Sequence, residues 1–211
     1  HAARAQSVLV SYFFQFPAAC SDHWIFENLA NTTQVLALSA VKVLRSFADT
    51  HRELRFGVKW PNDLICEEQK IGGILARAVM VSSRVDGVII GIGLNINTER
   101  AELDNIQRKV WPPTSLRAEL GSAAEIDVAA VRGQLARTFR ADLREFFAQG
   151  FALFLPTLNE LQVLCGRRVD FRIDDESVVQ GVFKGLNERG HILLEDDAGK
   201  VQDYPCGEIA Q

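Results

Sequence analysis

The chain has 211 residues, and its 23 lysines and arginines against 27 aspartates and glutamates give a formal net charge of −4. A mildly acidic chain is a poor candidate for a general nucleic-acid-binding protein, because neutralising phosphates requires a basic surface. Hydrophobic residues make up 47% and charged residues 24%, as in ordinary globular proteins. No run approaches the ~18 consecutive apolar residues that span a bilayer. We therefore expect a globular protein that binds neither membranes nor nucleic acids.

The cysteines and histidines give no sign of a disulfide framework or a metal site. Cys20, Cys66, Cys165 and Cys206 are scattered without a CxxC pair, whereas disulfide scaffolds and zinc ribbons have characteristic spacings. The four histidines are isolated, and none has the spacing of metal ligands. We expect free thiols in a reducing, cytoplasmic environment.

Strand and helix patterns alternate through the first 160 residues. β-branched and aromatic residues indicate the strands, polar turns separate them, and apolar residues at helical spacing indicate the helices. The predicted elements are strands over 8–16, 54–60 and 85–94, a hairpin over 64–80, and helices over 30–47 and 127–147.

The sequence pattern changes after about residue 160. Apolar residues alternate with polar ones over 169–173. Short apolar runs separated by polar turns follow, at 178–179, 182–183, 192–194 and 201–204. This pattern predicts a small all-β unit of about five strands that resembles a compact barrel. We therefore expect two domains, residues 1–160 and residues 161–211.

Three short clusters carry most of the chemical information. They read KWPND at 59–63, KIGGIL at 70–75 and GIGLNIN at 91–97. Lys59 lies at the end of a predicted strand, which is a rigid platform for a site, but a lone lysine is more often a solvated surface residue. Asn62 and Asp63 are ordinary turn formers. Alone, the first cluster therefore predicts no site.

Glycines next to a lysine make the second cluster more informative. Gly72 and Gly73 follow Lys70 closely and remove side chains where backbone must approach a neighbour. A lysine beside exposed backbone N–H groups suits a phosphate or a carboxylate, and a β-bulge with a solvated lysine is the alternative. Gly91 and Gly93 also permit close approach, but position 96 is Ile and no helix follows, which excludes a GxGxxG dinucleotide motif.

Together, the order, spacing and residue types of the three clusters resemble those of the biotin protein ligases. Thr114-Ser115-Leu116 is similar to another element of that family, and residues 207–209 resemble the end of its C-terminal domain. The resemblance implies an α+β fold. Its larger domain would be a mixed, largely antiparallel sheet with flanking helices, related to class II aminoacyl-tRNA synthetases, and its C-terminal domain an SH3-like β barrel.

The resemblance also implies an ATP-dependent ligation in two steps. The biotin carboxylate attacks the α-phosphate of ATP and gives biotinyl-5′-AMP and pyrophosphate. A lysine of the biotin carboxyl carrier domain of a carboxylase then attacks the acyl-adenylate. Such catalysis consists of positioning and charge stabilisation. The implied cofactors are ATP and Mg²⁺, with biotin as substrate, and the enzyme would be a monomer or a homodimer.

The site residues of the family carry over by position. Lys70 matches the catalytic lysine that contacts the biotin carboxylate and the α-phosphate. The implied biotin-binding residues are Gln6, Lys70, Gly72, Gly73 and Gly91. The implied ATP- or adenylate-binding residues are Lys59, Trp60, Asn62, Asp63, Gly93 and Asn95. Asp63 is also the implied Mg²⁺ ligand, since magnesium usually takes one or two protein carboxylates together with phosphate oxygens.

The chain departs from the family in two places. Ala76-Arg77 stands where many members have a small or aliphatic residue and then Glu. The glycine- and arginine-rich loop that covers biotin and its adenylate is absent, because Gln6 is followed directly by Ser7 and a predicted strand; the strand upstream of that loop is absent as well. Either the loop is deleted, or a segment is missing between Gln6 and Ser7. We expect the second, since binding loops belong to the least stable parts of a structure.

Three other functions stay open at this point. A lipoate–protein ligase shares the fold and the adenylation chemistry but lacks the KWPND cluster and a C-terminal barrel of this type. A non-catalytic module that holds biotin or a carrier domain is consistent with the absent loop. A bifunctional ligase–repressor would carry a winged helix-turn-helix domain before His1.

Overall fold

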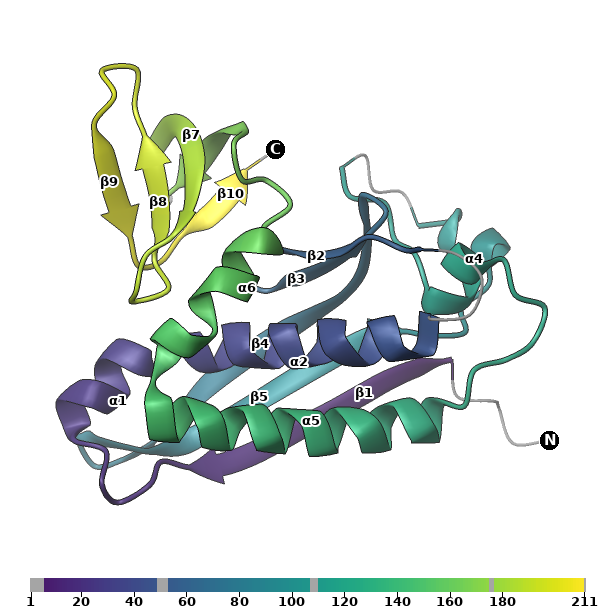
Figure 1. Ribbon diagram of the computed structural model, residues 1–211, viewed down its shortest axis with the longest axis horizontal. Coiled ribbons are helices and arrows are strands. Elements are labelled where there is room, and N and C mark those ends of the chain that lie inside the picture. Colours follow the sequence, from purple (N-terminus) through teal and green to yellow (C-terminus); the bar gives the residue numbers. More distant parts are fainter. Residues whose placement is uncertain (1–5, 49–52, 107–109, 175–176, 211) are drawn as a thin grey trace.

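The computed structural model of the chain describes residues 6–48, 53–106, 110–174 and 177–210. It contains two five-stranded sheets, and Figure 1 shows the C-terminal sheet, in yellow, apart from the larger first sheet. All pairings between the labelled strands are antiparallel. Parallel pairing in the described part of the chain is limited to two isolated bridges, Val58 with Gln162 and Lys70 with Pro113. The mixed sheet that the resemblance implied is therefore an antiparallel sheet with two parallel bridges.

The first sheet has the strand order β1-β5-β4-β3-β2. Its strands are β1 (Ser7–Gln15), β2 (Phe56–Lys59), β3 (Asp63–Cys66), β4 (Gln69–Val81) and β5 (Arg84–Asn95). These strands confirm the predicted strands and the predicted hairpin, because stretches of β-branched and aromatic residues between turn residues suit a half-buried sheet.

Two long helices cover one face of the first sheet, as Figure 1 shows. They are α2 (Asn31–Ala48) and α5 (Val128–Gln149), and both confirm the prediction. Asp127 caps α5, since its side chain accepts hydrogen bonds from two backbone N–H groups of the first turn. The short helices were not predicted, because three to seven residues are too few to show an apolar stripe. They are α1 (Asp22–Asn28), α3 (Arg100–Leu103), α4 (Leu116–Leu120), the 3₁₀ helix η1 (Phe151–Leu153) and α6 (Leu155–Glu160).

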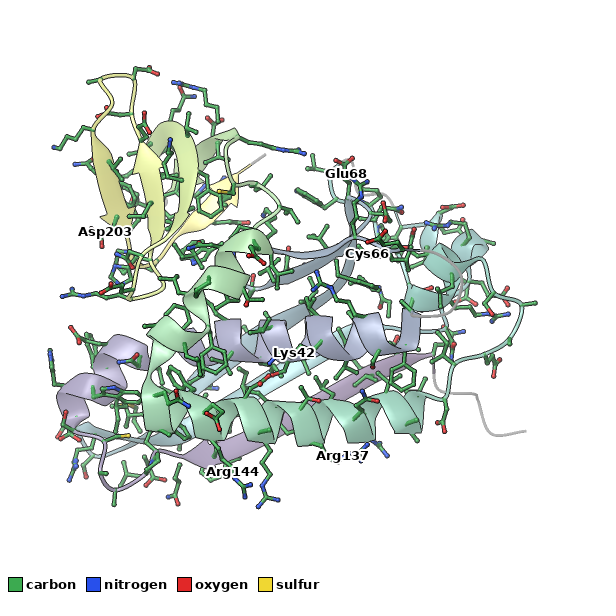
Figure 2. All side chains as sticks on the ribbon, in the orientation of Figure 1. Lys42, Cys66, Glu68, Arg137, Arg144 and Asp203 are labelled. Carbon is green, nitrogen blue, oxygen red and sulfur yellow. The ribbon has the colours of Figure 1, made fainter. Side chains whose placement is uncertain are left out.

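The second sheet has the strand order β10-β6-β7-β8-β9. Its strands are β6 (Arg168–Arg172), β7 (Val178–Leu186), β8 (Ile192–Glu195), β9 (Val201–Tyr204) and β10 (Glu208–Ala210). Asp203 of β9 is labelled in Figure 2. The five strands agree with the predicted number, but the runs at 178–179 and 182–183 form one strand, and β10 was not predicted.

One hydrophobic core runs through both parts of the chain. The change from the first sheet to the second occurs between α6 and β6, and the predicted boundary at residue 160 falls at the end of α6. Segment 161–163 also pairs with β2: the amide of Val58 donates to the carbonyl of Leu161 at 2.7 Å, and the amide of Val163 donates to the carbonyl of Val58 at 3.1 Å. No helix in the described ranges is long and apolar enough to cross a membrane.

Candidate functional site

The face of the first sheet opposite α2 and α5 carries a strip of bare backbone. Side chains alternate along a strand, so Gly91 and Gly93 of β5 point away from the core, while Ile92 between them is 3% exposed. Gly93 pairs with Leu9 of β1 on one side and with Gly73 of β4 on the other. Three glycines therefore meet on the open face, where a ligand can lie directly on the backbone.

A β-bulge brings Lys70 to this same face. Lys70 and Gly73 are three positions apart, so a regular strand would place them on opposite faces. The pairing of β3 with β4 shifts register between Lys70 and Gly72. Ile71 is the extra residue and is fully buried in the core. The bulge thus turns Lys70 toward the glycine strip, as bulges next to sites often do.

The Lys70 ammonium is held at the edge of the glycine strip. Its Nζ donates to Asp63 Oδ1 at 2.5 Å, and the two side chains are only 26% and 20% exposed. A Cβ placed on Gly73 would lie 3.6 Å from this Nζ and 3.5 Å from the Asp63 oxygen. The space above Gly73 therefore borders both the ammonium and the carboxylate.

Asn62 fixes the turn that carries Asp63. Its backbone carbonyl accepts from the amide of Ile74 at 2.9 Å, and its side-chain Nδ2 donates to the carbonyl of Ile74 at 2.9 Å. These two bonds tie the turn between β2 and β3 to β4. They anchor the residue before Asp63 to β4, the strand that carries Lys70.

A cavity of about 540 Å³ lies over this face. It brings together six of the residues predicted from the sequence: Asn62, Asp63, Lys70, Gly73, Gly91 and Gly93. Leu9 and Leu75, which are 80% and 77% exposed, also line it. The combination of apolar walls, a bare floor and one ammonium suits a ligand with an apolar body and an anionic end.

Three other predicted residues lie outside the lining of this cavity. Gly72 faces the core, where an added Cβ would lie 2.4 Å from the carbonyl oxygen of Gly93. Gln6 is exposed and directly precedes β1. Asn95 donates from Nδ2 to the carbonyl of Thr114 at 3.0 Å. Their roles in ligand binding stay predictions.

Lys59 and Trp60, which were predicted to contact the nucleotide, connect the two sheets in this structure. Lys59 Nζ donates to the carbonyl of Ile209 at 3.2 Å. Trp60 is 3% exposed, its Nε1 donates to the carbonyl of Gly190 at 3.3 Å, and its ring centroid lies 5.7 Å from that of Phe171. Trp60 also borders a second cavity of about 890 Å³ between the two parts of the chain.

The residues around Asp63 do not form a magnesium site by themselves. Asp63 supplies one carboxylate, and Lys70 already engages one of its oxygens. Over the ranges that the structure describes, no group of three or more His, Cys, Asp or Glu residues could hold a metal ion. The second oxygen of Asp63 is the one carboxylate oxygen that this turn would offer to Mg²⁺, with phosphate oxygens supplying other ligands.

The sequence reasoning missed the part that β1 contributes to the cavity. Leu9 and Ser11 line it, while Val8 points to the core and is 1% exposed. Alternation along the strand was the available signal, but Leu9 and Phe13 are apolar although they are exposed. The strand therefore looked buried on both faces.

Two family models match different parts of the chain. The model of the biotin/lipoate A/B protein ligase family matches residues 21–95. This range contains Asp63, Lys70 and the three glycines of the strip, but not β1. The model of the biotin protein ligase C-terminal domain matches residues 164–210, which contain the second sheet.

Two relatives illustrate the extent of the sequence similarity. The bifunctional ligase/repressor BirA of Escherichia coli is 30% identical over 177 residues, which are 83% of this chain and 51% of that protein. The biotin–[acetyl-CoA-carboxylase] ligase of Paracoccus denitrificans is 27% identical over 157 residues, which are 74% of this chain and 62% of that protein. The chain thus spans about half the length of the first of these relatives.

The fold is shared with a solved structure. The crystal structure of the biotin protein ligase from Aquifex aeolicus matches with a TM-score of 0.76 at 24% identity, over 97% of this chain and 81% of that chain. The first family model is named for both biotin and lipoate ligases, so it does not distinguish the two. The second model is named for the biotin protein ligases alone, and the same chain matches it. We conclude that the chain belongs to the biotin protein ligase family.

Proposed function

We propose that the chain is the catalytic part of an ATP-dependent biotin protein ligase. It would attach biotin to one lysine of a biotin carboxyl carrier domain through biotinyl-5′-AMP. The observation that carries this proposal is the Lys70 ammonium, held by Asp63 beside the bare backbone of Gly73, Gly91 and Gly93. The Aquifex aeolicus ligase, whose fold the chain shares, has been solved in complex with biotin and ATP.

The first step requires two anions to meet, and their repulsion must be reduced. We assign this task to Lys70, because its ammonium borders the glycines of the cavity floor. A carboxylate oxygen of biotin attacks the α-phosphorus of ATP. The bond to the bridging oxygen breaks, and pyrophosphate leaves with the electron pair. Lys70 stabilises the charge that develops on the phosphate oxygens.

The second step uses the same ammonium. The amine nitrogen of the acceptor lysine attacks the acyl carbon of biotinyl-5′-AMP, AMP leaves, and the new amide nitrogen loses a proton. Charge again develops on phosphate oxygens within reach of Lys70. The contribution of the chain to both steps is orientation and charge stabilisation, not a covalent intermediate on the protein.

The shape of the cavity supports biotin as the acid. Leu9 and Leu75 can cover the apolar ring and side chain of biotin, while Gly91 and Gly93 let the ligand lie close to β5. We keep Gln6, Lys59, Trp60 and Asn95 as proposed ligand contacts. In this structure Lys59, Trp60 and Asn95 are held by hydrogen bonds to the carbonyls of Ile209, Gly190 and Thr114.

The absent glycine- and arginine-rich loop has a defined place in this arrangement. Ser7 opens β1, and β1 borders the cavity through Leu9 and Ser11. A segment inserted between Gln6 and Ser7 would therefore emerge beside the cavity and would cover its open side. We propose that the complete enzyme has such a segment, and sequencing of the gene across this junction tests the proposal.

The domain folds, the protein partner and the location that we propose are those of the family. The first sheet with its helices would correspond to the class II synthetase-like domain, and the five antiparallel strands of the second sheet support an SH3-like barrel. The carrier domain of a carboxylase would be the macromolecular partner of a monomeric or homodimeric enzyme. The free thiols of Cys20, Cys66, Cys165 and Cys206 support the cytoplasm as its location.

Pyrophosphate release from ATP tests the proposed function. We expect release that depends on biotin, that lipoate does not support, and that decreases when Mg²⁺ is omitted. A folded full-length protein without biotin-dependent release would be a non-catalytic binding module. Release with lipoate and not with biotin would make the chain a lipoate ligase, and either result would refute the proposal.

A further inference from the structure

A buried carboxylate outside the three sequence clusters is connected to Lys70. We propose that Glu119 is a positioning residue that holds Lys70 and Asn95 in place. The inference rests on the function proposed above for these two residues. Glu119 lies on α4 and is 4% exposed.

The backbone of Lys70 depends on a segment outside the sheet. β5 ends at Asn95, and its pairing with β4 stops short of Lys70. The amide of Lys70 donates instead to the carbonyl of Pro112 at 2.9 Å, and the carbonyl of Lys70 accepts from the amide of Thr114 at 2.9 Å. Because Lys70 also sits beside the bulge, these two bonds replace the regular ladder on this side.

Glu119 fixes that segment and the start of β4 at the same time. Its Oε1 accepts from the hydroxyl of Thr114, from a guanidinium nitrogen of Arg100 at 2.7 Å and from Nε2 of Gln69 at 3.2 Å. The other terminal nitrogen of Arg100 donates to Oε1 of Gln69 at 2.9 Å. The side-chain amide of Gln69, the residue before Lys70, is thus held at both ends.

The same network reaches the second predicted contact. The carbonyl of Thr114 accepts from Nδ2 of Asn95, and the hydroxyl of Thr114 donates to Glu119. Three donors converge on one oxygen, and one of them is a cation. Glu119 is the buried member of this ion pair, while the Arg100 side chain is 42% exposed. A buried carboxylate must be balanced by such donors, and glutamine offers them no charge and only one acceptor oxygen, so it should not replace Glu119 without a shift of the segment.

The test compares Glu119→Gln with a matched control. Asp142 is also a buried carboxylate, 8% exposed, and accepts from the Ser39 hydroxyl at 2.7 Å and from Lys42 Nζ at 2.6 Å. It lies on α5 facing α2, near the labelled Lys42 in Figure 2. Asp142→Asn therefore removes a similar charge away from Lys70.

We expect Glu119→Gln to lower kcat for biotin-dependent pyrophosphate release about 10- to 100-fold, because misplacing a catalytic group by about 1 Å has effects of this size. The KM values for biotin and ATP should change by less than about 3-fold. Asp142→Asn should lower the unfolding temperature but leave kcat unchanged. The inference is wrong if Glu119→Gln keeps the parent kcat, or if both variants lose kcat equally.

A second measurement does not depend on the proposed function. Native-state hydrogen exchange measures the protection of the amides of Lys70 and Thr114. These amides donate the two hydrogen bonds that join Lys70 to the 112–114 segment. Their protection should fall in Glu119→Gln and stay unchanged in Asp142→Asn. If the parent chain has no biotin-dependent activity, the proposed function fails, and the exchange data still decide whether Glu119 holds Lys70. Unchanged protection at both amides in Glu119→Gln would overturn the inference.

Discussion

Alanine at position 73 should leave the fold intact. A Cβ at this position meets Asp63 Oδ1 at 3.5 Å and Lys70 Nζ at 3.6 Å, which are ordinary contact distances. Gly73 is also not among the glycines with positive φ. An alanine here restricts the unfolded chain, so the free energy of unfolding should stay the same or rise by about 0.5–1 kcal/mol.

The same methyl group should damage the site. It occupies the space above Gly73 in which we expect an anion to reach Lys70. Loss of one charge-assisted hydrogen bond costs about 1.5–3 kcal/mol. At about 1.4 kcal/mol per factor of ten, kcat/KM for biotin-dependent pyrophosphate release should fall about 10- to 150-fold in Gly73→Ala. A variant with the parent kcat/KM would refute the assignment of this space to the reacting anions.

Gly72→Ala is the matched control for this experiment. Its Cβ would lie 2.4 Å from the carbonyl oxygen of Gly93 and 2.8 Å from Cδ2 of Leu94, so β4 and β5 cannot keep their spacing. We expect the free energy of unfolding to fall by about 1–3 kcal/mol. A Gly72→Ala variant as stable as the parent would show that the two glycines do not differ in the way the structure requires.

Three more predictions concern other parts of the molecule. Lys70→Ala should abolish adenylate formation, and near-normal turnover would disprove the role of Lys70. The same change should cost no more than about 1 kcal/mol of stability, because the ion pair with Asp63 is partly exposed. Trp60→Phe should cost about 1–3 kcal/mol, since it loses the hydrogen bond to Gly190 and part of the buried ring. Trp60→Ala should cost more, about 3–5 kcal/mol, and equal urea midpoints for the two variants would contradict this. The hydrogen bond from His191 lowers the pKa of Asp203 below its ordinary value of 3.8. Asp203 therefore adds stability that is present above that value and is lost as the pH falls through the lowered pKa. The stability difference between the parent and Asp203→Asn should shrink below about pH 4, and a difference that does not vary with pH would count against the pair.

The long elements of the fold could be predicted from the sequence, because their patterns are local. Residues 127–147 carry an apolar stripe, and α5 occupies Val128–Gln149. The open face of β1 could not be predicted in the same way, because Leu9 and Phe13 are exposed apolar residues. Solvent exposure of these residues depends on which helices cover the sheet, and no local pattern contains that information.

The residue types of the site were predictable, but its geometry was not. The clusters at 59–63 and 70–75 named Asp63, Lys70 and Gly73, and the structure joins all three. The glycines after Lys70 raised a β-bulge as an alternative to an anion site, and the structure has the bulge. Its consequence, Lys70 and Gly73 on one face, depends on the pairing with β3 and could not be predicted. The contact of Trp60 with Phe171 and the bonds of Glu119 to Gln69 and Thr114 depend on tertiary packing.

The central claim is that the Lys70 face forms an acyl-adenylate. Rapid-quench isolation of biotinyl-5′-AMP from enzyme mixed with biotin and ATP tests it most directly, with the parent chain and Lys70→Ala compared at equal folded concentration. We expect the parent to accumulate biotinyl-5′-AMP in the absence of a carrier domain and Lys70→Ala to form none above the background without enzyme. Equal amounts of biotinyl-5′-AMP from the two proteins would contradict it.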